Sequence, residues 1–82
     1  LDGLSGVIRR NGPRPEPEKP DGDRSGTLFA LACAMAEQRY AEDIIYKELK
    51  EADIEWGGKY NSRPDGDKRL AGIVRDACKK VR

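Results

Sequence analysis

The apolar run from Thr27 to Ala36 constrains the fold of this chain more than any other feature. Its ten residues include one polar side chain, that of Thr27. The run is about half as long as a helix that crosses a bilayer, so it predicts a buried helix at the centre of a protein core. We therefore expect no membrane segment and a cytoplasmic protein.

Three helical patterns follow one another after residue 22. The first is expected over about residues 26–39, with Asp23 or Ser25 as the capping residue, the second over about 42–52 and the third over about 66–81. Apolar residues recur at i, i+3, i+4 and i+7. The expected inward positions are Leu28, Leu31, Ala32, Met35, Ile45, Leu49, Ala52, Leu70, Ile73, Val74, Ala77, Cys78 and Val81. The fold class that this predicts is all-α, a small bundle of three helices, with four as the alternative.

The N-terminal quarter of the chain has a different composition. Residues 1–10 are too rich in glycine to predict a helix, and residues 11–22 hold four of the five prolines. We expect a flexible, extended arm and no strand. The predicted organisation is an N-terminal arm or linker over residues 1–22 and a helical bundle domain over residues 23–82. Because the chain starts at Leu1 and not at Met, we expect a module of a longer protein.

Composition argues against catalysis and metal binding in this chain. There is no histidine, and Cys33 and Cys78 are expected as free thiols in facing helices, with a disulfide as the alternative. Phosphate-loop, dinucleotide-binding and nucleophile-elbow motifs are missing. Four carboxylates lie near expected helix starts, where the helix dipole stabilises negative charge: Glu42, Asp43, Asp65 and Asp67. We expect no enzyme activity, no catalytic residue and no metal site.

Charge is divided unevenly along the chain. Residues 25–55 carry a net charge of −4, whereas residues 56–82 carry +5. The positive excess begins in a glycine-hinged loop and continues into the last helix, where free backbone amides also favour an anion. This pattern indicates a surface that meets phosphate, with an ordinary solvated surface as the alternative. The candidate phosphate contacts are Lys59, Arg63, Lys68, Arg69 and Arg75.

Aromatic residues flank this basic segment. Tyr60 is a candidate for stacking on an unpaired base, an interaction worth about 1–3 kcal/mol, and anchoring the loop is its alternative role. Trp56 is expected to be structural, and either Trp56 or Ile54 would fix one end of the loop to the core.

Four short motifs carry a resemblance to a known family. They are Asp23-Arg24-Ser25 before the apolar helix, Tyr40-Ala41-Glu42-Asp43 before the second helix, Gly58-Lys59-Tyr60 with Arg63, and Arg75-Asp76-Ala77. In these the chain resembles the helix-bundle domain, primase C-terminal-like, that follows the primase–polymerase catalytic domain in replication proteins of plasmids, phages and other mobile elements. The sequence departs from that pattern at Tyr40, where glycine is usual.

The resemblance implies a non-catalytic accessory domain that binds single-stranded DNA template, an initiating nucleotide, or both, to support primer synthesis. By the same likeness Arg24 and Ser25 lie at the start of the first helix, and Lys59 and Arg63 contact phosphate. The implied partners are single-stranded DNA, a nucleoside triphosphate with Mg, and an adjacent primase–polymerase domain of the same chain. The domain is expected to be a monomer without a cofactor of its own.

Two other functions are compatible with the residues. The acidic second helix favours a protein-interaction or spacer module that docks on the catalytic domain or a helicase domain. A free-standing DNA-binding regulator fits three helices, but the connection before the last helix is longer than the turn of about three or four residues in a helix-turn-helix.

Overall fold

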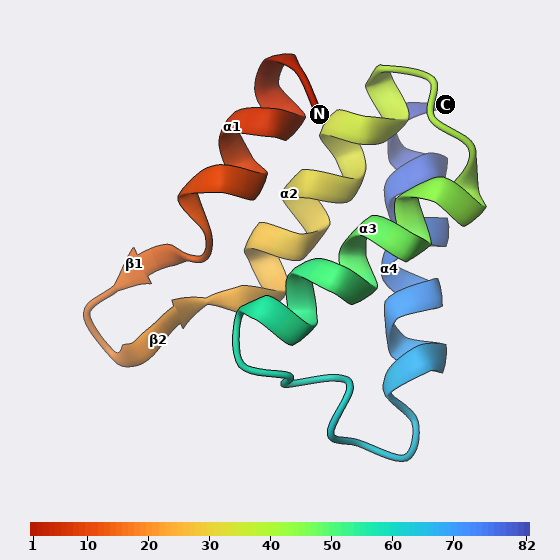
Figure 1. Ribbon diagram of the computed structural model, residues 1–82. Coiled ribbons are helices and arrows are strands. Elements are labelled where there is room, and N and C mark those ends of the chain that lie inside the picture. The colour runs from red at the N-terminus through yellow and green to blue at the C-terminus, as the bar shows by residue number, and fades with distance from the viewer.

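Four helices and one hairpin, joined by loops, form the fold that Figure 1 shows for the computed structural model, which describes all 82 residues. The elements are α1 (Gly3–Asn11), β1 (Arg14–Glu16), β2 (Lys19–Asp23), α2 (Arg24–Glu37), α3 (Glu42–Glu55) and α4 (Gly66–Val81). Helices α2, α3 and α4 pack on one another, α1 lies beside α2, and the hairpin extends away from the bundle. None of these helices combines the length and the hydropathy that a membrane span requires.

The three predicted helices are confirmed, with shifts at their ends. Helix α4 has the predicted bounds. Helix α2 begins at Arg24 because the Asp23 carboxylate accepts a hydrogen bond from the Gly26 amide at 3.0 Å, which makes Asp23 the capping residue. Helix α3 continues three residues beyond the predicted end, to Glu55.

The core lies between α2, α3 and α4. Helix α2 supplies the central residues Leu28, Leu31 and Met35, all fully buried. The other members of the buried cluster are Ala32, Ala36, Ile45, Leu49, Ala52, Tyr60, Leu70, Val74, Ala77 and Cys78. Burying large aliphatic side chains stabilises a domain by about 1.5–3 kcal/mol each. The predicted inward positions are thus confirmed, except that Ile73 and Val81 are only partly buried.

The prediction of a flexible arm over residues 1–22 is wrong, first because α1 is a helix packed against the bundle. Ser5 is fully buried, and its hydroxyl contacts the side-chain oxygen of Gln38 just beyond α2. Ile8 packs against the core cluster, and Arg9 forms ion pairs with Glu48 and Glu55 of α3. Tertiary contacts therefore outweigh the low helix propensity of the glycines in α1.

The proline-rich segment also contradicts the prediction of a flexible arm, because it forms an antiparallel hairpin. Arg14 pairs with Asp23 and Glu16 with Lys19, with an irregularity between the two pairs. Proline is compatible with a two-stranded ladder because both strands are edge strands, on which a missing amide donor can face solvent. The Arg14 amide also donates to the Thr27 hydroxyl at 3.0 Å, which ties the hairpin to α2. The boundary between residues 22 and 23 as a domain border stays a prediction.

Helices α2 and α3 end in the same backbone motif with different residues. After α2, the Arg39 amide donates to the Ala36 carbonyl and the Tyr40 amide to that of Met35. After α3, Gly57 and Gly58 make the equivalent bonds. This Schellman pattern needs a left-handed residue, which is Gly57 at φ 109° in one case and Arg39 at φ 69° in the other. The family pattern described in the sequence analysis has glycine at the position of Tyr40. In this chain the left-handed residue is Arg39, so position 40 does not require glycine.

Both chain ends lie at one end of α2. The Gln38 side chain donates to the Asp2 carbonyl at 3.0 Å, and the Arg82 guanidinium donates to the Tyr40 carbonyl at 2.5 Å. The connection between α3 and α4 lies at the opposite end of the molecule, at the bottom of Figure 1.

Candidate nucleic-acid interface

The basic loop, defined here as residues 56–65 between α3 and α4, is organised by one buried carboxylate. Asp53, 1% exposed in the last turns of α3, accepts hydrogen bonds from the Tyr60 and Asn61 amides at 2.9–3.2 Å. Its Oδ2 also accepts one from the Asn61 side chain at 2.7 Å. Charge-assisted hydrogen bonds are stronger than neutral ones, so Asp53 holds the middle of the loop in a single shape.

A second network ties the basic loop to the start of α2. The Ser25 hydroxyl lies 2.7 Å from the Tyr60 hydroxyl, and the Lys59 ammonium donates to the same Ser25 oxygen at 2.8 Å. The three residues, predicted separately from the sequence, thus form one hydrogen-bonded group. An ammonium has three donors, so Lys59 keeps two for another acceptor.

Tyr60 lies at the centre of the group and is 7% exposed. The Lys59 Nζ lies 5.5 Å from the centroid of its ring, and the Arg63 guanidinium carbon lies 5.8 Å from it. The sequence left two roles open for Tyr60, and its buried position fits the loop anchor, since base stacking needs an exposed ring face. The ring instead makes a cation–π contact with each of these two cations.

Arg24 and Trp56 join the same end of the molecule. The Arg24 guanidinium donates to the Trp56 carbonyl at 3.3 Å and lies 3.8 Å from the Asp21 carboxylate. Trp56 packs against the core, as predicted, whereas Ile54 is 59% exposed and does not fix the loop. Arg24 therefore connects the hairpin, α2 and the end of α3, and contributes positive charge beside Lys59.

The cations of α4 divide into two groups. Lys68 is exposed at the first turn without an ion-pair partner, whereas Arg69 pairs with Asp65 at 2.8 Å. The pKa of Asp65 is lowered by its hydrogen bond from Arg69, and the pKa of Arg69 is raised by the same bond. Arg75 lies further along α4, in a hollow beside the start of α3, so it does not share the group around Tyr60.

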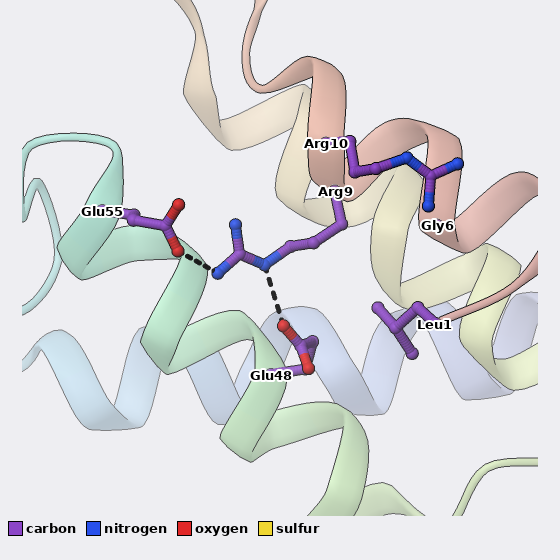
Figure 2. Close-up of a pocket in the computed structure, with 6 residues that line it drawn as sticks. All are labelled: Leu1, Gly6, Arg9, Arg10, Glu48 and Glu55. Carbon is purple, nitrogen blue, oxygen red and sulfur yellow. Dashed lines mark hydrogen bonds and ion pairs between the residues drawn. The ribbon is translucent and has the colours of Figure 1, made fainter.

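A polar hollow of about 450 Å³ lies between α1 and α3 (Figure 2). Arg9 crosses it to reach Glu48 at 2.8 Å and Glu55, while Arg10 points away from both carboxylates (Figure 2). The pKa of Arg9 is raised and that of Glu55 is lowered, chiefly by their mutual hydrogen bond. Both carboxylates of this hollow are paired with Arg9, so the hollow is a structural contact that holds α1 on α3.

Sequence reasoning missed Asp53, Asn61 and Gly66 as residues that shape the basic loop. A Cβ at Gly66 would overlap the Tyr60 carbonyl oxygen, so only glycine allows α4 to start so close to the loop. The one available signal was Asp53 itself, a carboxylate directly after the inward-facing Ala52. Both cysteines are free thiols, and no group of three or more His, Cys, Asp or Glu side chains is placed to hold a metal ion.

Comparison with known protein families gives a match over residues 15–61, to the family described as Primase C terminal 1 (PriCT-1). The match covers more than half of the chain. The chain belongs to the PriCT-1 family. PriCT-1 is an accessory domain of primases, so the resemblance found in the sequence is confirmed. No curated protein and no solved structure gave a match. The PriCT-1 match includes Arg24, Ser25, Lys59 and Tyr60, and it ends before Arg63 and α4.

Proposed function

We propose that this PriCT-1 domain binds the single-stranded template, and the triphosphate of an initiating nucleotide, during primer synthesis. The observation that supports this most is the pair of cations, Lys59 and Arg63, each of which contacts the Tyr60 ring. Neither forms an ion pair with a carboxylate of the domain, so both are available to an outside anion. Phosphate oxygens are the acceptors that such a pair suits best.

The surroundings of the pair favour this ligand further. Asp53 and Ser25 fix the basic loop before any ligand arrives, which lowers the entropic cost of binding. Lys68, exposed and unpaired in the first turn of α4, adds positive charge at this end of the molecule, whereas the charge of Arg24 is partly offset by Asp21. The domain contributes no metal ligands to this proposal: Mg would come with the nucleotide, bound to its phosphates. Template and nucleotide share phosphate as the recognised group.

Binding can be tested with the purified domain and a fluorescently labelled oligothymidylate, by anisotropy at several salt concentrations. The double variant Lys59→Gln with Arg63→Gln should bind at least about tenfold more weakly than the wild type, and its salt dependence should be shallower by about 1.4, because two phosphate contacts are lost. A second titration with ATP and Mg, followed by NMR, tests the nucleotide.

The matched control removes the same charge elsewhere, by Arg10→Gln with Lys47→Gln, two exposed cations on α1 and α3 without ion-pair partners. It should bind within about twofold of the wild type. Equal weakening in the two double variants would reduce the effect to net charge and contradict the proposal. Binding of neither oligonucleotide nor nucleotide by the folded wild-type domain would overturn it.

A second candidate function, docking on a neighbouring protein domain, is favoured by a hollow of about 480 Å³ between α3 and α4. Its apolar part consists of Tyr46, Ala71 and Val74, and Glu42 and Asp43 at one rim have no ion-pair partner. Substituting Glu42 and Asp43 by their amides should then weaken association with a primase–polymerase or helicase domain and leave DNA binding undiminished. Unchanged association would exclude this function for the hollow.

A further inference from the structure

Helix α4 and its C-terminal cap carry six cations, and three of them are already engaged within the protein. The engaged pairs are Arg69 with the Asp65 carboxylate at 2.8 Å, Lys80 over the Phe29 ring at 5.6 Å from its centroid, and Arg82 with the Tyr40 carbonyl oxygen at 2.5 Å. Each of these cations has a structural partner, so none is a free contact for a ligand.

The other three cations, Lys68, Arg75 and Lys79, are exposed and have no ion pair, side-chain hydrogen bond or ring contact within the protein. They are spaced at i, i+7 and i+11, which places them on one face of the helix. We call these three residues the α4 stripe. Over eleven residues at 1.5 Å each, the stripe extends about 16 Å along the helix axis.

The Arg75 side chain makes the α4 stripe continuous past Gly72, which lies between Lys68 and Arg75. A Cβ at Gly72 would lie 3.9 Å from the Arg75 Nη2, so the guanidinium lies back along the helix over this position. Its charge therefore occupies the turn that separates Lys68 from Arg75. The stripe begins at Lys68, next to the basic loop, and leads away from it.

We propose that the α4 stripe is a track for the sugar-phosphate backbone of single-stranded DNA that continues from the basic loop. This inference rests on the proposed function and extends it to a helix outside the PriCT-1 match. A row of unpaired cations with a free face suits a flexible chain of phosphates, which can adjust its spacing to theirs. A strand bound in this way would run along α4 from its first turn towards its C-terminal end.

The test compares two triple variants that lose the same charge from the same helix. The stripe variant carries Lys68→Gln, Arg75→Gln and Lys79→Gln, and the control carries Arg69→Gln, Lys80→Gln and Arg82→Gln. Against a long oligothymidylate, the stripe variant should lose at least about tenfold in affinity, and its salt dependence should become shallower by about 2, one phosphate contact for each residue. The control should lose less than about threefold. Circular dichroism verifies that both variants fold. If the triple stripe variant does not fold, the three single substitutions of the α4 stripe are measured in its place.

A second measurement uses Glu42, one of the two carboxylates in the hollow beside the middle of the α4 stripe. Glu42 shares a hollow with Arg75, whereas Glu51 is an exposed residue of α3 that lines no part of it. If the strand passes Arg75, Glu42→Gln should strengthen binding about twofold or more, and Glu51→Gln should change it by less. Equal effects would indicate net charge alone and contradict the track.

These outcomes separate the inference from the function on which it rests. Loss of binding in the Lys59 and Arg63 double variant, with the stripe variant equal to its control, would overturn the track and leave the proposed function intact. A wild-type domain that binds no oligonucleotide would overturn both.

Discussion

Asp53 is the residue on which the shape of the basic loop depends most. Its carboxylate accepts from two backbone amides and one side-chain amide while it is almost completely buried. An acceptor in this position cannot be replaced by water, because the loop covers it. The positions of Lys59 and Arg63 therefore depend on a residue that would touch neither DNA nor nucleotide, so its role is to position them.

Asp53→Asn is expected to destabilise the domain by about 2–3 kcal/mol, because an amide group would turn a donor towards the donors of Tyr60 and Asn61. Urea denaturation followed by circular dichroism measures this loss. Asp43→Asn, the same chemical change at an exposed position of α3, should alter stability by less than about 0.5 kcal/mol. Equal, small effects in the two variants would mean that the loop does not need the carboxylate.

Arg39 shows the opposite relation between residue and backbone. It occupies a left-handed position at the end of α2 that the equivalent motif after α3 gives to Gly57. A side chain in this conformation costs about 1–2 kcal/mol. Glycine removes that cost, but it also makes the unfolded chain more flexible, which cancels part of the gain in stability.

Arg39→Gly should therefore stabilise the domain by about 0.5–1 kcal/mol and raise its melting temperature. The reverse change, Gly57→Ala, should destabilise it, since φ is 109° and a Cβ would lie 2.9 Å from the Arg24 Nη1. Calorimetry of both variants is the measurement, and a destabilising Arg39→Gly would contradict the argument.

At the scale of elements, the sequence predicts best where one helix face carries the whole signal. Helix α4 could be predicted to the residue because Leu70, Val74 and Ala77 repeat with the helical period and face the core. The hairpin and α1 could not, because their stability comes from contacts with distant residues: Arg14 with Thr27, Ser5 with Gln38. The candidate cations could be listed from the sequence, but which of them have partners depends on packing.

Arg9 joins α1 to α3, and substituting it measures how much its ion pairs contribute to the stability of the domain. Arg9→Met keeps much of the packing of the side-chain stem and removes the ion pairs. Because Glu55 is exposed and screened by solvent, we expect a loss of about 0.5–1 kcal/mol at neutral pH, mainly from the pair with Glu48. A thermal melt with Arg10→Met as the control tests this, because Arg10 is exposed and forms no ion pair. An equal loss in both variants would contradict the role of Arg9.

The same contact gives a prediction about pH. Because Arg9 lowers the pKa of Glu55 in the folded state, the pair stabilises the domain above the unfolded pKa of Glu55. That stabilisation is lost as the pH falls through the folded pKa. In Arg9→Met the pKa of Glu55 should return towards 4.5, as followed by NMR titration of its carboxyl carbon. An unchanged pKa would show that Arg9 is not its cause.

At the scale of the whole molecule, α2 is the element along which the charged surfaces and the other elements are placed. The basic loop lies at the N-terminal end of α2, and the exposed acidic residues Glu42 and Asp43 lie at the start of α3, near the other end of α2. Residues 1–22 complete this arrangement, since α1 packs on α2 and α3 and the hairpin continues directly into α2.

A domain shortened to residues 23–82 should consequently be less stable than the full chain by at least about 2 kcal/mol, because Ile8 and Arg9 leave the surfaces that they cover. Chemical denaturation of the two polypeptides measures the difference. Equal stability would support the predicted border between residues 22 and 23 as the edge of the folding unit.

The meeting of both chain ends near residues 38–40 has a mechanical consequence. A pulling force applied through the two ends would act first on the contacts of Gln38 with Asp2 and of Tyr40 with Arg82. The helices would then separate starting at that end, so the force would reach the basic loop at the opposite end of the molecule last. Under tension between its two ends, the domain would therefore keep the shape of its basic loop until the contacts at residues 38–40 had broken.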